Sequence, residues 1–178
     1  MTLYLLRHAE AVNVGENGIT RDSDRPLTER GRRQAIRMGS VLQQLGVKFD
    51  VVLASPLERA RETAGLVLQT LALRSKIRTV PSLQPHGTVD AMWAAICGAG
   101  GEHVLAVGHL PSIATLAGTL LGSHSEDAIW FHKATIAALH CENLPARHPR
   151  VRLEWMLAPA LVKRLASHAS TPSAASAR

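Results

Sequence analysis

Short apolar runs alternate with longer amphipathic segments along most of the chain. The short runs, too brief for core helices, predict strands at residues 2–6, 51–54, 77–80 and 104–107. Apolar residues that recur at three- and four-residue steps predict helices from a Thr28 cap to Gly46, from Ser55 and Pro56 onward, near 89–97, and from Pro111. Two later strand patterns, 135–140 and 152–157, predict an antiparallel pair at the edge of the sheet.

Strands that alternate with helices at this spacing indicate a largely parallel sheet with helices on both faces. A length of 178 residues suits one domain, which we expect over residues 1–166. The predicted fold is a single-domain three-layer α/β/α sandwich with a mostly parallel central sheet and an antiparallel edge strand. Residues 167–178, mostly Ser, Ala, Thr and Pro, are predicted to form a disordered tail.

The composition indicates where in the cell the protein is expected. Hydrophobic residues make up 46% of the chain and charged residues 19%, as in ordinary globular proteins. Residues 1–6 are followed by Arg7 without a basic leader or cleavage site, and no run approaches the roughly 20 apolar residues that cross a bilayer. Cys97 and Cys141 are far apart in the sequence and support neither a disulfide framework nor a metal site. We therefore expect a cytoplasmic protein with no membrane attachment.

The charge could indicate a nucleic-acid partner, but its distribution does not. The net charge is +6 and the isoelectric point is near 10.1. The arginines are spread along the chain, and no zinc finger, RNA-recognition motif or alternation of aromatic and basic residues accompanies them. The sequence favours a basic surface that attracts anionic substrates, with no nucleic acid as partner.

Three polar clusters follow predicted strands, at residues 7–10, 55–59 and 108–111. Ligands of open α/β sheets lie beyond the carboxyl ends of the strands, so we expect these clusters to meet. They supply guanidinium groups from Arg7 and Arg59 and imidazoles from His8 and His109. Arginine binds phosphate oxygens in pairs and a neutral imidazole can attack phosphorus, so the clusters predict a phosphatase.

The mechanism that these residues suggest is covalent. His8 would attack the phosphoryl group while its other ring nitrogen donates to a backbone carbonyl, and water would then hydrolyse phospho-His8. Arg7, Arg59 and His109 would bind the equatorial oxygens. No metal or cofactor is expected, since the other histidines show no spacing typical of metal ligands.

The clusters resemble the motifs of the histidine phosphatase superfamily, which includes phosphoglycerate mutases and acid phosphatases. The family's Arg-His-Gly is matched by Arg-His-Ala at residues 7–9, and its late Gly-His by residues 108–109. Its helix opening, Ser-Pro-Leu-x-Arg-Ala-x-x-Thr-Ala, is matched by residues 55–64, with Arg59 at the phosphate-binding position. The resemblance implies a phosphoglycerate mutase-like fold.

The chain is similar in particular to the compact SixA-type phosphohistidine phosphatases. Residues 24–28 (Asp-Arg-Pro-Leu-Thr), 109–111 (His-Leu-Pro) and 153–159 carry this resemblance. It implies a phosphorylated protein as partner, such as a His-containing phosphotransfer domain of a bacterial relay, with phosphate as product. Arg25 would join the phosphate site at its rim, and Ser55 would be either a further phosphate ligand or a helix cap.

Two departures from the larger family bear on the chemistry. Ala9 stands where glycine is usual, beside the expected nucleophile. The inserted region that carries the family's acidic proton donor is missing, and Glu10, His86 and Asp90 are the candidates for that role. A protonated phosphoimidazole leaves without a dedicated acid, so the sequence favours phosphohistidine over phosphate esters.

Two other functions fit the same motifs. One is a small-molecule phosphomonoesterase of the superfamily, which a carboxylate beside the leaving group would favour. The other is a catalytically idle phosphoprotein-binding domain that has lost turnover because of Ala9.

Overall fold

Six strands form one central sheet in the computed structural model, which describes residues 1–123, 128–143 and 149–169. The strands are β1 (Thr2–Arg7), β2 (Val51–Ala54), β3 (Ile77–Thr79), β4 (His103–Gly108), β5 (Ile136–Glu142) and β6 (Arg150–Leu157). Their order across the sheet is β3-β2-β4-β1-β5-β6. β1, β4, β2 and β3 pair in parallel, whereas β5 is antiparallel to both β1 and β6. The mostly parallel sheet and the antiparallel pair at its edge are confirmed.

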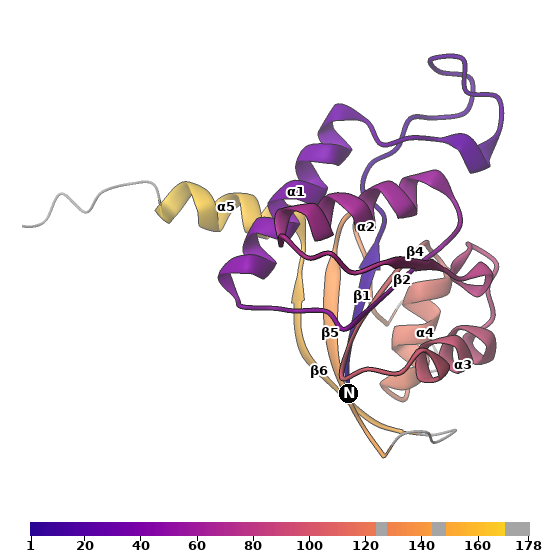
Figure 1. The fold of residues 1–178 in the computed structure, drawn as a ribbon, viewed down its shortest axis with the longest axis vertical. Coiled ribbons are helices and arrows are strands. Elements are labelled where there is room, and N and C mark those ends of the chain that lie inside the picture. The colour runs from indigo at the N-terminus through magenta and orange to yellow at the C-terminus, as the bar shows by residue number, and fades with distance from the viewer. Residues whose placement is uncertain (124–127, 144–148, 170–178) are drawn as a thin grey trace, which may run out of the picture.

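Helices cover both faces of this sheet, which confirms the three-layer fold (Figure 1). One face carries α1 (Glu29–Gln44), α2 (Glu58–Thr70) and α5 (Pro159–Ala169), and the other carries α3 (Val89–Ala99) and α4 (Ser112–Leu120). Two short 3₁₀ turns, η1 (Asp22–Asp24) and η2 (Pro81–Leu83), lie in the loops. In the described part of the chain, no helix is long and apolar enough to span a membrane.

Alternation along the central strands divides the core into two layers. Leu3 and Leu5 of β1 point into the apolar layer under α3 and α4, while Tyr4 and Leu6 point into the layer under α1 and α2. Successive side chains of a strand face opposite sides of the sheet, so a continuous apolar run is needed when both sides are covered. This is why the short runs of the sequence read correctly as buried strands.

The start of α1 packs its backbone directly against the loop after β1. Thr28 caps the helix as predicted, its hydroxyl accepting the Gly31 N–H at 2.9 Å. A β-carbon on Gly31 would lie 1.9 Å from the carbonyl oxygen of Glu10, which is far inside van der Waals contact. Glycine at position 31 therefore lets α1 hold the loop that carries His8.

We expect Gly31→Ala to destabilise the fold by about 1–3 kcal/mol, because backbone must move to admit the methyl group. The matched control is Gly65→Ala in α2, where an added β-carbon meets nothing within 4 Å. That control should leave stability unchanged or raise it by about 0.5–1 kcal/mol, since alanine favours a helix. Denaturant unfolding measures both, and equal stability of the two variants would contradict the close packing of α1.

Two predictions about the helices need correction. The second helix does not begin at Ser55 and Pro56: Leu57 still has extended backbone (φ −68°, ψ 137°), so α2 begins at Glu58. The chain needs three residues to turn from β2 into the helix, and the Ser55 hydroxyl accepts the Leu57 N–H at 3.3 Å within that turn. The second correction is α5, which the sequence analysis did not identify. Pro159 at its start and Val162, 1% exposed against the core, are its local signals.

The predicted tail overlaps the end of this helix. α5 extends to Ala169, so the first three positions of the 167–178 segment are helical. Residues 170–178 lie outside the described part of the chain. The domain boundary at residue 166 stays a prediction.

Candidate active site

The three polar clusters lie together because β2, β4 and β1 are neighbours that end at the same edge of the sheet. Arg7 is in register with Gly108, and the His8 N–H donates to the Gly108 carbonyl at 3.0 Å. The Ser55 N–H donates to the Val107 carbonyl at 2.9 Å, which fixes the end of β2 beside the end of β4. The three loops therefore start from adjacent strand ends, as expected for a ligand site in this kind of sheet.

His8 is buried, and its hydrogen bond fixes the tautomer. Its Nδ1 lies 2.7 Å from the carbonyl oxygen of Ala9. A carbonyl can only accept, so Nδ1 carries the proton and Nε2 keeps its lone pair. The His8 ring lies 4.8 Å from the His109 ring, centroid to centroid, with 49° between the planes. His8 thus has the unprotonated nitrogen that attack on phosphorus requires.

Burial keeps both imidazoles neutral. Desolvation lowers the pKa of His8 to about 3; the hydrogen bond to Ala9 opposes this shift, and the positive charges of Arg59 and Arg7 add to it. Burial likewise lowers the pKa of His109 to about 2, with the neighbouring His8 as the next contribution. Above pH 5 the nucleophilic nitrogen is therefore free of a proton without help from a base.

These pKa values predict a loss of stability in acid. The unfolded chain protonates both histidines near pH 6.5 and the folded chain does not, so unfolding takes up protons below that pH. The stability is fully present above about pH 6.5 and falls as the pH drops toward 3, by at most about 1.4 kcal/mol per pH unit for each histidine. We expect the free energy of unfolding of a His8→Gln, His109→Gln variant to fall less between pH 7 and pH 4.5 than that of the wild type. Parallel pH curves in urea unfolding would contradict this.

Arg59 is anchored in the site by Asp22, a residue of η1 that the sequence analysis did not single out. Nη1 of Arg59 donates to the Asp22 carbonyl at 2.7 Å, and Nη2 donates to the Asp22 carboxylate at 3.0 Å. The same carboxylate accepts from Nη1 of Arg25 at 2.8 Å. Although burial alone would raise it, the hydrogen bonds and charges of Arg25 and Arg59 hold the pKa of Asp22 below its usual value. Asp22 is therefore ionised and positions the two guanidinium groups.

The other arginines of the site are anchored by backbone carbonyls. Arg7 Nη1 donates to the Phe131 carbonyl at 2.8 Å, and Arg25 Nε donates to the Val12 carbonyl at 2.5 Å. Burial lowers the pKa of Arg7 and of Arg59, but from a starting value so high that both guanidinium groups stay charged. Three fixed positive charges therefore lie around a neutral histidine.

Several buried nitrogen atoms at this site have no hydrogen-bond partner in the protein. Among the described residues these are the Nε atoms of Arg7 and Arg59 and both ring nitrogens of His109. Buried polar groups are nearly always hydrogen-bonded, so a cluster of unpaired ones marks a place where a ligand makes the bonds. Because most of these groups are cationic or neutral N–H donors, the chemistry fits an oxyanion.

Ala9, the departure from the family pattern, fits its position without strain. Its side chain is fully buried in a small apolar cluster with Leu27 and Ala35. Its N–H donates to the Thr63 hydroxyl at 3.0 Å, and that hydroxyl donates to the Arg59 carbonyl at 2.6 Å. The nucleophile loop is thus tied to the helix that carries Arg59. Thr63 belongs to the helix motif in the sequence, but its link to residue 9 appears only in the fold.

The proton-donor role of Glu10, His86 or Asp90 stays a prediction. Glu10 accepts from the Thr28 hydroxyl at 3.0 Å and pairs with Arg30 at 3.5 Å, while His86 and Asp90 lie exposed before and at the start of α3. In the part of the chain that the structure describes, no hydrogen bond or ion pair joins any of the three to His8. Ser55 is fully buried and uses its hydroxyl in the turn after β2, so its role as a phosphate ligand stays a prediction.

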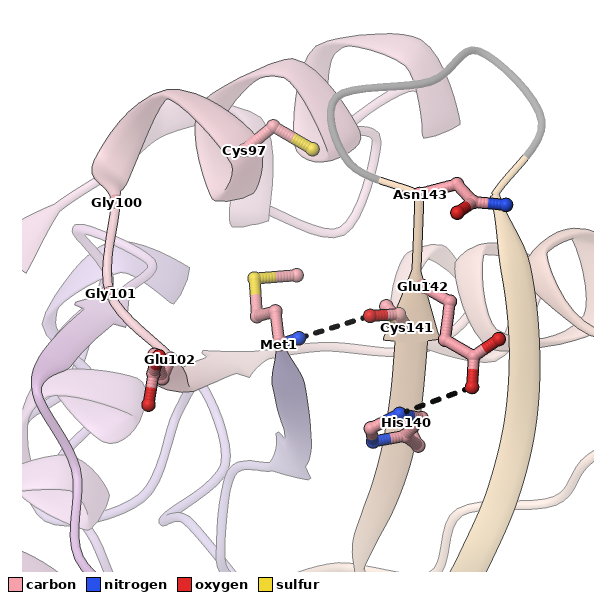
Figure 2. Close-up of a pocket in the computed structure, with 9 residues that line it drawn as sticks. All are labelled: Met1, Cys97, Gly100, Gly101, Glu102, His140, Cys141, Glu142 and Asn143. Carbon is pink, nitrogen blue, oxygen red and sulfur yellow. Dashed lines mark hydrogen bonds and ion pairs between the residues drawn. The ribbon is translucent and has the colours of Figure 1, made fainter.

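The opposite edge of the sheet carries a different hollow. Its volume is about 540 Å³, and Figure 2 shows it between the start of β1, the end of α3 and the end of β5. Both cysteines, Cys97 and Cys141, line it as free thiols, so no disulfide joins them. Among the described residues, its lining includes no arginine and no member of the strand-end clusters. Within the described residues, no group of three or more His, Cys, Asp or Glu side chains could hold a metal.

The fold is an α/β domain whose strand-end site suits an oxyanion beside a neutral histidine, and comparisons with known proteins identify its family. The family model of the histidine phosphatase superfamily (branch 1) matches residues 3–85. An uncharacterized protein of Picosynechococcus sp. is 32% identical over 145 residues, which is 78% of this chain and 84% of that protein. The structure of the protein histidine phosphatase SixA complexed with tungstate has a TM-score of 0.76 and 27% identity, covering 90% of this chain and 98% of that one.

The chain belongs to the histidine phosphatase superfamily. The mitochondrial serine/threonine-protein phosphatase Pgam5 of Drosophila ananassae is 44% identical over 69 residues, or 39% of this chain. This chain matches only 22% of the length of Pgam5, so the similarity concerns a shared segment and not the whole of that protein. Family membership and the SixA-like fold support phosphatase activity.

Proposed function

We propose that this protein is a phosphohistidine phosphatase that works through a phosphorylated His8. The observation that supports this most is the unprotonated Nε2 of His8 beside buried, unpartnered donors of Arg7, Arg59 and His109. A nucleophile and an oxyanion-binding cluster are thus preformed in one place. The similar SixA structure carries tungstate, a tetrahedral oxyanion.

The proposed reaction has two balanced steps. Nε2 of His8 forms a bond to phosphorus as the bond from phosphorus to the substrate nitrogen breaks, and the leaving imidazole departs as the neutral ring because it entered protonated. Water then attacks the phosphorus of phospho-His8, the bond to Nε2 breaks, and phosphate leaves with the excess proton passing to solvent. Arg59 uses its unpartnered Nε on the phosphoryl oxygens while Asp22 holds the opposite edge of the guanidinium.

The choice of phosphohistidine over an ester follows from the carboxylates near His8. Asp22 contacts the phosphate-binding arginines, but it is ionised and accepts hydrogen bonds, so it cannot donate a proton to a leaving alkoxide. Glu10 is already bound to Thr28 and Arg30. An alkoxide needs a proton as it leaves, whereas a protonated imidazole does not. The phosphoprotein would be a cytoplasmic one, in keeping with the two free thiols.

The test is a parallel assay of one enzyme preparation on a phosphohistidine peptide, phosphoramidate and p-nitrophenyl phosphate. We expect kcat/KM to be at least tenfold higher for the two substrates with a phosphorus–nitrogen bond, as a rough lower limit. Faster hydrolysis of the ester would reject the proposal in favour of a small-molecule phosphomonoesterase. Binding of the peptide with no turnover of any substrate would show an idle phosphoprotein-binding domain.

A further inference from the structure

A basic groove lies next to the active site and shares Arg7 with it. Its volume is about 770 Å³, and it lies between α1, the segment 130–133 and the start of α5. Six cationic side chains line it: Arg7, Arg30, Arg33, Arg37, Lys133 and Lys163. The sequence analysis did not identify this groove, because its charges come from four separate parts of the chain.

The arginines of the groove share one face of α1. Arg30, Arg33 and Arg37 are spaced three and four residues apart, which places them in a row along the helix. The opposite face of the same helix packs into the core through Ala35, Met38 and other apolar residues. The packing of α1 therefore keeps the three arginines on the groove side of the helix, even when individual side chains change rotamer.

The charge of the groove is mostly uncompensated. Among the described residues of its lining, Glu10 is the only carboxylate, and it pairs with Arg30 at 3.5 Å. In the described ranges, no ion pair engages Arg33, Arg37 or the two lysines of the groove. Uncompensated cations in a concave surface concentrate the electric field and attract anionic partners.

The position of the groove decides which part of a substrate meets it. Arg7 both lines the groove and lies beside His8, lowering the pKa of that histidine. A protein large enough to cover His8 would therefore also cover these cations. Trp130, 57% exposed, borders the same groove and offers an apolar face for that surface.

We propose that this groove recognises acidic side chains of the phosphoprotein substrate that flank its phosphohistidine. This rests on the proposed function, and it adds a specificity determinant outside the catalytic residues. A groove bordered by an exposed tryptophan and open arginines suits the surface of a protein better than a small metabolite, which would need enclosure. Nucleic acid is the other polyanion to test, because six cations also suit a phosphate backbone.

The experiment uses two phosphohistidine peptides that differ only in their flanks, one with three glutamates and one with three glutamines. We expect the wild type to prefer the acidic peptide by about tenfold in kcat/KM, with the preference falling as salt rises. Arg33→Glu with Arg37→Glu should remove this preference and leave phosphoramidate hydrolysis within about twofold of wild type. The matched control is Arg74→Glu with Lys76→Glu, two exposed residues outside the groove with the same change of charge; it should keep the preference.

Three other outcomes would separate a failure of the groove proposal from a failure of the proposed function. Equal hydrolysis of both peptides by the wild type would overturn the groove proposal and leave the phosphatase intact. Failure to hydrolyse phosphoramidate and both peptides would instead reject the proposed function. If a labelled single-stranded RNA oligomer, and not the acidic peptide, binds the wild type and is lost on Arg33→Glu with Arg37→Glu, the groove is a nucleic-acid site and the proposal is wrong.

Discussion

Replacement of His8 by alanine is expected to reduce turnover of phosphoramidate at least about a thousandfold, because the covalent route loses its only nucleophile. The hydrogen bond from His8 to Ala9 leaves the lone pair of Nε2 free for attack. We do not expect His109 to replace this nucleophile, because its unpartnered ring suits a donor to the phosphoryl oxygens. Wild-type enzyme quenched in acid-free denaturant after reaction with ³²P-labelled phosphoramidate should carry label on His8. The His8→Ala variant should carry none.

The control for this experiment is His140→Ala, a partly exposed histidine that lines the hollow at the opposite edge of the sheet and pairs with Glu142. It should keep full activity and the same labelling. His8→Ala should still unfold cooperatively in urea, which would show that the loss of turnover is not a loss of the fold. Near-normal turnover by His8→Ala, or label on a different residue of the wild type, would reject the covalent mechanism.

The sequence was sufficient to predict which residues lie together at the strand ends, because most of them follow strands directly. The position of a residue at a strand end is known once the strands and their order are known. Apolar runs such as 51–54 define those strands well. Once β1, β2 and β4 are neighbours, Arg7, His8 and His109 have little freedom to lie elsewhere. The structure also has His8 donating to a backbone carbonyl, as the mechanism required.

Contacts that depend on loop paths could not be predicted in this way. Asp22 lies in a loop where Arg25, three residues later, is an obvious local partner, but nothing local indicates its bonds to Arg59. The basic groove likewise needs the position of α5, which brings Lys163 beside α1. The arginines are scattered along the sequence, but the fold brings several of them together on the surface.

Removal of the Arg59 guanidinium should have the second largest effect. We expect Arg59→Ala to lower kcat for phosphoramidate by about 10²–10³, the usual cost of one preorganised donor to a developing oxyanion. Arg59→Lys should recover only part of this loss. The three donors of an ammonium group sit on one nitrogen atom and cannot span Asp22 and the phosphoryl group as the planar guanidinium fork does. Steady-state kinetics on phosphoramidate and the labelling of His8 measure the two effects.

A matched control separates loss of the site from loss of charge. Arg61→Ala removes a guanidinium from the same helix at an exposed position, where the side chain pairs only with Glu58 at 3.4 Å, and should leave kcat unchanged. The kcat of Asp22→Asn should lie between those of Arg59→Ala and Arg61→Ala. The amide keeps an acceptor for Arg59 but loses the charge that holds Arg25. If Arg59→Ala and Arg61→Ala proved equally active, the phosphoryl group would have to bind away from Nε of Arg59, and the unpartnered donors around His8 would need another ligand.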